Sequence, residues 1–149
     1  MFHRHPFLSL VTGGYLAFVG WLTLTPHPLG KETMVWRLLG GLHRRGYAEW
    51  LDFNRLEFLA NIGLFVPIGM FFLLLFGTRW WWLAGLAGFG MTVFIETVQR
   101  DIPGRVSDPR DVVANTAGTL IGVVLAAVLT LPATITRARR RQPQRAMAR

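Results

Sequence analysis

Four stretches of the chain carry no charged side chain, and each approaches the length of a membrane span. They are residues 7–24, 58–78, 80–95 and 112–136. A transmembrane helix needs about 20 consecutive apolar residues to cross about 30 Å of hydrocarbon. A soluble domain of 149 residues has no use for so many long apolar runs. The sequence therefore predicts an all-α integral membrane protein, a bundle of four transmembrane helices.

The third apolar run is short for a span, and it reaches spanning length only if it takes in residues 96–99. Glu96 therefore belongs to the membrane helix. The predicted spans are 7–25, 57–77, 80–99 and 111–133.

The first run has an alternative interpretation as a signal peptide, because Arg4 precedes it. Its apolar stretch exceeds the roughly 7–15 residues of such a peptide, and the following "TLTPHPLG" has no small-x-small cleavage pattern. We expect a permanent helix. The chain has no cysteine, which excludes disulfides, thiolate chemistry and cysteine-based metal sites.

An even number of spans places both termini on one side of the membrane. The 16 Lys and Arg residues divide equally, eight to each side, but six arginines crowd into residues 137–149 without an acid, and all eight Asp and Glu lie on the other side. The positive-inside rule then favours cytoplasmic termini in the bacterial cytoplasmic membrane. We predict a membrane domain over residues 1–136 and a basic, disordered cytoplasmic tail over 137–149, which anchors to lipid headgroups rather than to nucleic acid.

The loops differ in character. "GTR" at 77–79 predicts a tight helical hairpin, and Trp80, Trp81 and Trp82 follow it as an aromatic interface belt. The first outer loop, residues 26–54, predicts short interfacial helices or, equally, a packed loop helix. The residues able to share one helical face there are Val35, Leu38, Leu39 and Leu42.

Two helix beginnings share one pattern of polar residues with spacings of three and four. The first is Asn54, Glu57 and Asn61, and the second is Asp108, Asp111 and Asn115. Each resembles a capping box with Asn54 or Asp108 at the cap, Pro109 suits a first helical position, and Asp111 lies near the positive end of the helix dipole. The pairing also allows an internal repeat of two hairpins whose second helices run in the same direction.

The two asparagines lie deeper than caps do. Each follows its first helical position by six residues, about 9 Å along a helix, and a buried amide needs hydrogen-bond partners. In the fourth span the polar stripe continues from Asn115 to Gly118 and Gly122, where glycines allow another helix to approach closely. Ordinary helix packing is the favoured explanation for these glycines.

Glu96 lies near the carboxyl end of its helix, where the dipole disfavours a negative charge, so capping does not explain it. One interpretation is an exposed ion pair with Arg100, four residues on. The favoured interpretation is a buried carboxylate that faces the bundle and pairs with Arg105 or Arg110. The amides available to hydrogen-bond it belong to Asn61 and Asn115.

Three motifs in this order resemble the VanZ-like family of small bacterial membrane proteins. They are N-x-x-x-F-x-P-x-G from Asn61 to Gly69, E-x-x-Q at Glu96 and Gln99, and R-x-x-D-x-x-D-x-x-x-N-x-x-G from Arg105 to Gly118. The resemblance covers roughly residues 7–130 and leaves out the basic tail. It implies a multi-helix protein of the cell envelope, in a family some of whose members are associated with resistance to teicoplanin-type glycopeptide antibiotics.

These residues together predict a polar site on the outer face of the bundle, with Arg100 and Arg110 nearby. Its members are Asn61, Glu96, Gln99, Arg105, Asp108, Asp111 and Asn115. Arginines and amides beside acids suit the head of an anionic or lipid-linked envelope molecule, such as a cell-wall precursor. We therefore expect binding or modulation of such a molecule, with membrane lipids as further partners and no cofactor or nucleic acid.

Two other functions stay open. The first is a membrane-embedded hydrolase or transferase acting on a lipid-linked substrate, with Glu96 as the catalytic general base. The second is a purely structural bundle whose polar cluster fastens the helices. Glu96, Asp108 and Asp111 could also hold Mg²⁺ or Ca²⁺, although the caps already explain two of them.

Overall fold

The computed structural model describes residues 6–25, 31–47, 50–102 and 108–146, and within these ranges the chain is helical, without strands. The helices are α1 (Pro6–Leu24), α2 (Lys31–Arg44), α3 (Phe53–Phe76), the short 3-10 turn η2 (Thr78–Trp80), α4 (Trp81–Gln99) and α5 (Pro109–Ala146).

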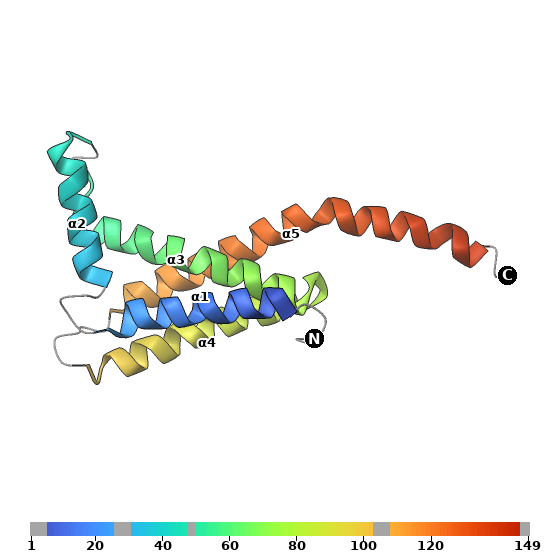
Figure 1. Ribbon diagram of the computed structural model, residues 1–149, viewed down its shortest axis with the longest axis horizontal. Helices are drawn as coiled ribbons and strands as arrows, with labels where there is room; N and C mark the ends of the chain where they lie inside the picture. Colours follow the sequence, from blue (N-terminus) through green and yellow to red (C-terminus); the bar gives the residue numbers. More distant parts are fainter. Residues whose placement is uncertain (1–5, 26–30, 48–49, 103–107, 147–149) are drawn as a thin grey trace.

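Among the described residues, four helical segments are long and apolar enough to cross a membrane, which confirms the predicted fold class. They are Pro6–Leu24, Phe53–Phe76, Thr78–Gln99 and Pro109–Leu131. Figure 1 shows α1, α3, α4 and the first part of α5 running together as a bundle, with α2 lying crosswise at the end where α3 and α5 begin and α4 ends. We call this end the α2 end. Which side of the membrane it faces stays a prediction.

The third helix begins four residues before the predicted start of its span. Asp52 is its N-cap, with an extended backbone (φ −91°, ψ 173°) and a side chain that accepts a hydrogen bond from the backbone N–H of Arg55. The assignment of the cap to Asn54 was therefore wrong. Asp52 stands only two residues earlier and is an equally good cap residue, so spacing alone did not separate the two.

The predicted hairpin between α3 and α4 is present. Gly77 ends α3 with a positive φ of 85°, a conformation that glycine adopts without steric cost. Its N–H donates to the Leu73 carbonyl oxygen at 2.7 Å, and the Trp80 N–H donates to the Gly77 carbonyl oxygen at 2.9 Å. Trp80, Trp81 and Trp82 are all exposed, as an aromatic belt at a membrane interface requires.

Glycines set the closest contact of the bundle, between α3 and α5. A Cβ added to Gly122 would lie 2.0 Å from the Val66 carbonyl oxygen, and one added to Gly118 would lie 2.3 Å from the Ile62 carbonyl oxygen. The contact is reciprocal, because a Cβ on Gly69 of α3 would lie 2.0 Å from a carbonyl oxygen of α5. The predicted role of these glycines in helix packing is confirmed.

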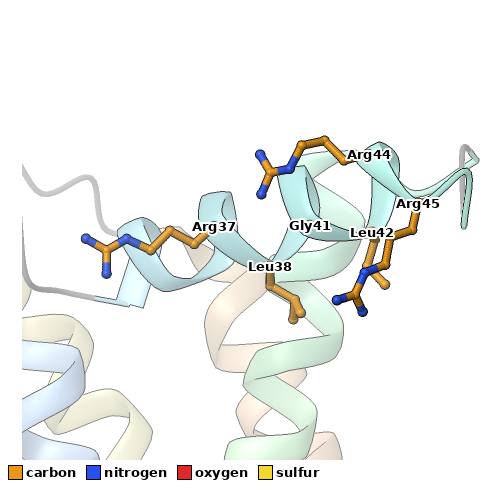
Figure 2. Close-up of a pocket in the computed structure, with 6 residues that line it drawn as sticks. All are labelled: Arg37, Leu38, Gly41, Leu42, Arg44 and Arg45. Atoms are coloured by element: carbon orange, nitrogen blue, oxygen red, sulfur yellow. The ribbon is translucent and has the colours of Figure 1, made fainter.

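The second helix is only partly packed. Val35 and Leu39 are buried in a cluster with Leu51 and Leu56, at the start of α3. Leu38 was predicted on the same face but is 53% exposed, and Figure 2 shows it pointing from α2 towards the rest of the bundle. Thus α2 packs one edge on α3 and leaves other apolar residues uncovered.

The last helix continues past its apolar segment. It runs to Ala146, so it extends into residues 137–149, for which the sequence predicts a disordered tail. The division of the chain at residue 136 stays a prediction.

Candidate functional site

The inward face of α4 carries polar residues at its α2 end. Thr92, Glu96 and Gln99 are buried, at spacings of four and three that place them on one side of the helix. The Glu96 side chain is 4% exposed, so the carboxylate faces the bundle and is not a solvated helix end beside the exposed Arg100. Its predicted partners are Arg105, which lies outside the described residues, and Arg110, and that pairing stays a prediction.

Asn61 connects α3 to α5. Its amide nitrogen Nδ2 donates to Oδ1 of Asp111 at 2.6 Å, within hydrogen-bonding range of a charge-assisted contact. The Asn61 side chain is 2% exposed, and Asp111 is half-buried at the first turn of α5. Asp111 therefore does more than complement the dipole of its own helix, because it satisfies a buried amide on another.

Asn115 connects α5 to α4. Its Nδ2 donates to the Thr92 hydroxyl at 2.8 Å, one turn before Glu96. Its other polar atom, Oδ1, is buried and has no hydrogen-bond partner among the described residues. A buried acceptor in this state attracts a donor from water or from a ligand.

Gln99 connects α4 to α1, and its predicted part in ligand binding stays a prediction. Its Nε2 donates to the Thr23 carbonyl oxygen at 2.8 Å, in a buried contact. Thr23 lies in the last turn of α1, where carbonyl groups have no partner within the helix. Gln99 thus ties the end of α4 to the end of α1.

A small polar cavity of about 30 Å³ lies between the first turns of α3 and α5. It is lined by Asn54, Glu57, Phe58, Asp108, Arg110 and Asp111. The patterns that begin at Asn54 and at Asp108 therefore face each other across the cavity. Its charged lining consists of three acids and one arginine. Its volume suits one or two ordered waters or a single polar group of a ligand.

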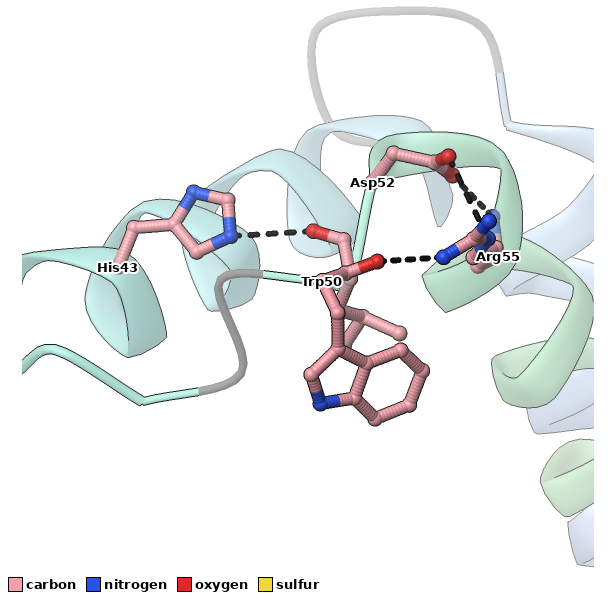
Figure 3. A network of polar contacts seen from close by, with 5 residues as sticks. His43, Trp50, Asp52 and Arg55 are labelled. Carbon is pink, nitrogen blue, oxygen red and sulfur yellow. Dashed lines mark hydrogen bonds and ion pairs between the residues drawn. The ribbon is translucent and has the colours of Figure 1, made fainter.

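Beside the cavity is an open groove of about 610 Å³, which shares Asn54, Phe58 and Arg110 with it. Trp50 and Leu59 supply apolar surface to this groove. Figure 3 shows how its rim is held. The Arg55 Nη1 donates to the Trp50 carbonyl oxygen at 2.7 Å, and Arg55 Nε lies 3.6 Å from an Asp52 carboxylate oxygen. His43 of α2 donates through Nε2 to the Leu51 carbonyl oxygen at 3.0 Å, which fastens α2 beside the groove.

Asp108 caps α5 as predicted. Its Oδ1 accepts from the backbone N–H of Arg110 at 2.8 Å, and Pro109 takes the first helical position.

Asp108→Ala should therefore lower the free energy of unfolding by about 1 kcal/mol, whereas Asp108→Asn keeps an acceptor and should change it little. Denaturant unfolding in detergent, followed by circular dichroism, measures both. Equal losses for the two variants would show that the charge, not the cap, is what the fold requires.

The predicted site residues thus form neighbouring groups. Asn61, Asp108 and Asp111 meet at the α3–α5 contact, Glu96 and Asn115 lie on the inner faces of α4 and α5, and Gln99 faces α1. Sequence reasoning missed Thr92, although its position four residues before Glu96 is a usable signal. Among the described residues, no group of three or more acids or histidines has the geometry to hold a metal ion.

A protein-family model described as VanZ/LLP1 matches residues 13–130. The chain belongs to the VanZ/LLP1 family. The match includes α3, α4 and the start of α5, hence every predicted site residue of this VanZ/LLP1 protein. No curated protein and no solved structure matches the chain.

Proposed function

We propose that this VanZ/LLP1 protein binds the polar head of a lipid-linked envelope molecule, such as a cell-wall precursor, at the α2 end of the bundle. The observation that carries the proposal is the acid-rich cavity between α3 and α5, open to a groove with apolar walls. In the predicted orientation this end faces outward, where such molecules carry their sugars.

The lining matches a head group that has both hydroxyl and phosphate groups. Glu57, Asp108 and Asp111 are acceptors suited to the hydroxyl and amide donors of a sugar or short peptide. Arg110 lines both cavity and groove, and its guanidinium suits a phosphate oxygen. The first turns of α3 and α5 meet here, and the positive ends of their dipoles favour an anion as well.

The groove suits the less polar part of the same molecule. Trp50, Phe58 and Leu59 give it aromatic and aliphatic walls next to the polar cavity. A ligand that is polar at one end and apolar at the other can therefore fill both without leaving a buried polar group unpaired. Retention of a cell-wall precursor in this way would reduce its availability to teicoplanin-type antibiotics.

Binding is better supported than turnover. The alternative function, a membrane-embedded hydrolase or transferase, needs Glu96 in contact with its substrate. Glu96 is 4% exposed and does not line the cavity or the groove. Two of the carboxylates that line the cavity, Asp111 and Asp108, already accept hydrogen bonds from Asn61 and from the first turn of α5 respectively.

Native mass spectrometry of the detergent-purified protein tests the proposal. The wild type should carry the mass of a lipid-linked cell-wall precursor, and Arg110→Gln should reduce its occupancy roughly tenfold or more, because a hydrogen bond to a charged group is lost. Arg100→Gln is the matched control, since Arg100 is also exposed at this end but does not line the cavity or the groove. An empty wild type would overturn the proposal, and a precursor converted during incubation would favour the enzyme.

A further inference from the structure

A second groove, of about 470 Å³, lies between α1, α2 and α3 and shares no lining residue with the proposed head-group site. Its walls are apolar and include Leu22, Met34, Leu38, Gly63 and Leu64. The one hydroxyl in the lining belongs to Tyr15 and is already used, because it donates to the Leu64 carbonyl oxygen at 2.8 Å. The groove is therefore suited to hydrocarbon.

The groove has a definite depth below the α2 end. Tyr15 lies nine residues before the end of α1 at Leu24, which is about 14 Å along a helix. Gly63 leaves the wall open, since a Cβ placed on it would meet no atom within 4 Å. An extended acyl chain that enters from the membrane surface can follow this path.

Positive charge gathers at the mouth of the groove. A neighbouring pocket of about 290 Å³ on α2 is lined by Arg37, Arg44 and Arg45, together with Leu38, Gly41 and Leu42. Among the described residues no acid lines either hollow, and all three arginines are exposed. In Figure 2 the side chains of Arg45 and Leu38 point to the same side of α2, towards the bundle.

The two hollows are neighbours, because Leu38 lines both of them. The Leu38 side chain therefore lies between the basic pocket and the apolar groove. Because α2 lies crosswise at the end of the bundle (Figure 1), its arginines stand at headgroup level when the groove lies within hydrocarbon. Positive charge at headgroup level and an apolar groove within the hydrocarbon match an amphiphile with an anionic head group.

We propose that this groove binds one anionic phospholipid of the surrounding membrane, with its phosphate at the α2 arginines and an acyl chain between α1 and α3. The lipid covers the exposed apolar side chains of α2 and holds that helix at the bundle end. The site is independent of the proposed head-group site, and it needs no particular orientation of the protein in the membrane.

Two pairs of variants test the two halves of the site. Replacing Arg45 by Gln removes charge on the side of α2 that carries Leu38, and Arg100→Gln removes one charge elsewhere at the same end. Gly63→Leu fills the groove, and Gly90→Leu places the same side chain on an exposed glycine of α4 that also has open space around it. Leu38→Gln is a second groove variant. It makes part of the apolar wall polar at an exposed position, so it should not disturb packing.

The measurement is native mass spectrometry of each detergent-purified variant, titrated with phosphatidylglycerol or phosphatidylcholine. The wild type should bind one phosphatidylglycerol at least fivefold more tightly than phosphatidylcholine. Arg45→Gln should weaken phosphatidylglycerol about fivefold, by the usual contribution of a basic residue at an anionic surface. Gly63→Leu and Leu38→Gln should weaken both lipids, and the two controls should change neither.

Several results would overturn the proposal. They are equal affinity for the two lipids, an effect of Arg100→Gln as large as that of Arg45→Gln, or unchanged binding in both groove variants. Thermal unfolding of each variant in detergent shows whether a loss reflects the site or the fold. If the groove of the wild type stayed free of lipid, its occupant would have to be a protein partner instead. Arg110→Gln should leave this lipid bound, which separates the result from failure of the head-group site.

Discussion

Gly122→Ala should lower the free energy of unfolding by about 3 kcal/mol or more, at the upper end of what overpacking costs. The added Cβ would lie 2.0 Å from the Val66 carbonyl oxygen and 3.0 Å from the Met70 nitrogen. These are backbone atoms of α3, which cannot rotate away as a side chain can. Only a separation of α3 from α5 relieves the clash, and that separation also opens the Asn61–Asp111 contact.

The matched control is Gly90→Ala on α4, where an added Cβ meets no atom within 4 Å. It should leave stability unchanged or raise it by up to about 1 kcal/mol, because alanine favours helix over glycine. Denaturant unfolding in detergent compares the two. Equal behaviour of the variants would mean that α3 and α5 do not cross at these glycines.

Glu96→Gln should lower the free energy of unfolding by about 3–5 kcal/mol if the carboxylate is paired with Arg105, because the substitution leaves a buried guanidinium without its counter-charge. Glu96 is 4% exposed, so its charge is not stabilised by solvent. Glu96→Gln combined with Arg105→Gln should regain much of the loss, whereas Arg100→Gln should be nearly silent. Unfolding of the wild type, Glu96→Gln, Arg105→Gln and the double variant in detergent gives the coupling energy directly.

A silent Glu96→Gln would contradict this account of the buried acid. A destabilised Glu96→Gln that Arg105→Gln does not rescue would show that another group is its partner.

The membrane fold was predictable because it depends on the length and hydropathy of each segment, which can be read along the sequence. Uncharged runs of spanning length located all four membrane helices, and Gly77 located the hairpin between two of them. The start of α3 was missed because Asp52 and Asn54 are both good caps, and the sequence does not show which side chain meets a free N–H. The glycines at 118 and 122 predicted a close helix neighbour, but not that the neighbour is α3.

The contacts of the site depend on which helices are adjacent and on how each is rotated, and spacing along the chain does not contain this. The structure shows the Asn61 amide donating to Asp111, a contact that the spacing did not indicate. It also shows the Gln99 amide donating to the Thr23 carbonyl oxygen of α1, while the assignment of Gln99 to ligand binding stays a prediction. What the sequence did indicate was that the patterns beginning at Asn54 and Asp108 belong together, and they line one cavity.

Site-directed photo-crosslinking tests most directly whether a lipid-linked molecule binds between α3 and α5. A photoreactive residue at Phe58 would lie in the wall of both cavity and groove. The control is Phe94, which lies on α4, five residues before its end, and is 63% exposed. Phe58 is five residues from the start of α3, so the two positions have matched depth at the same end of the bundle. We expect a labelled lipid-linked cell-wall precursor to crosslink at position 58 and not at position 94, and equal labelling at both positions, or none at 58, would contradict the proposed function.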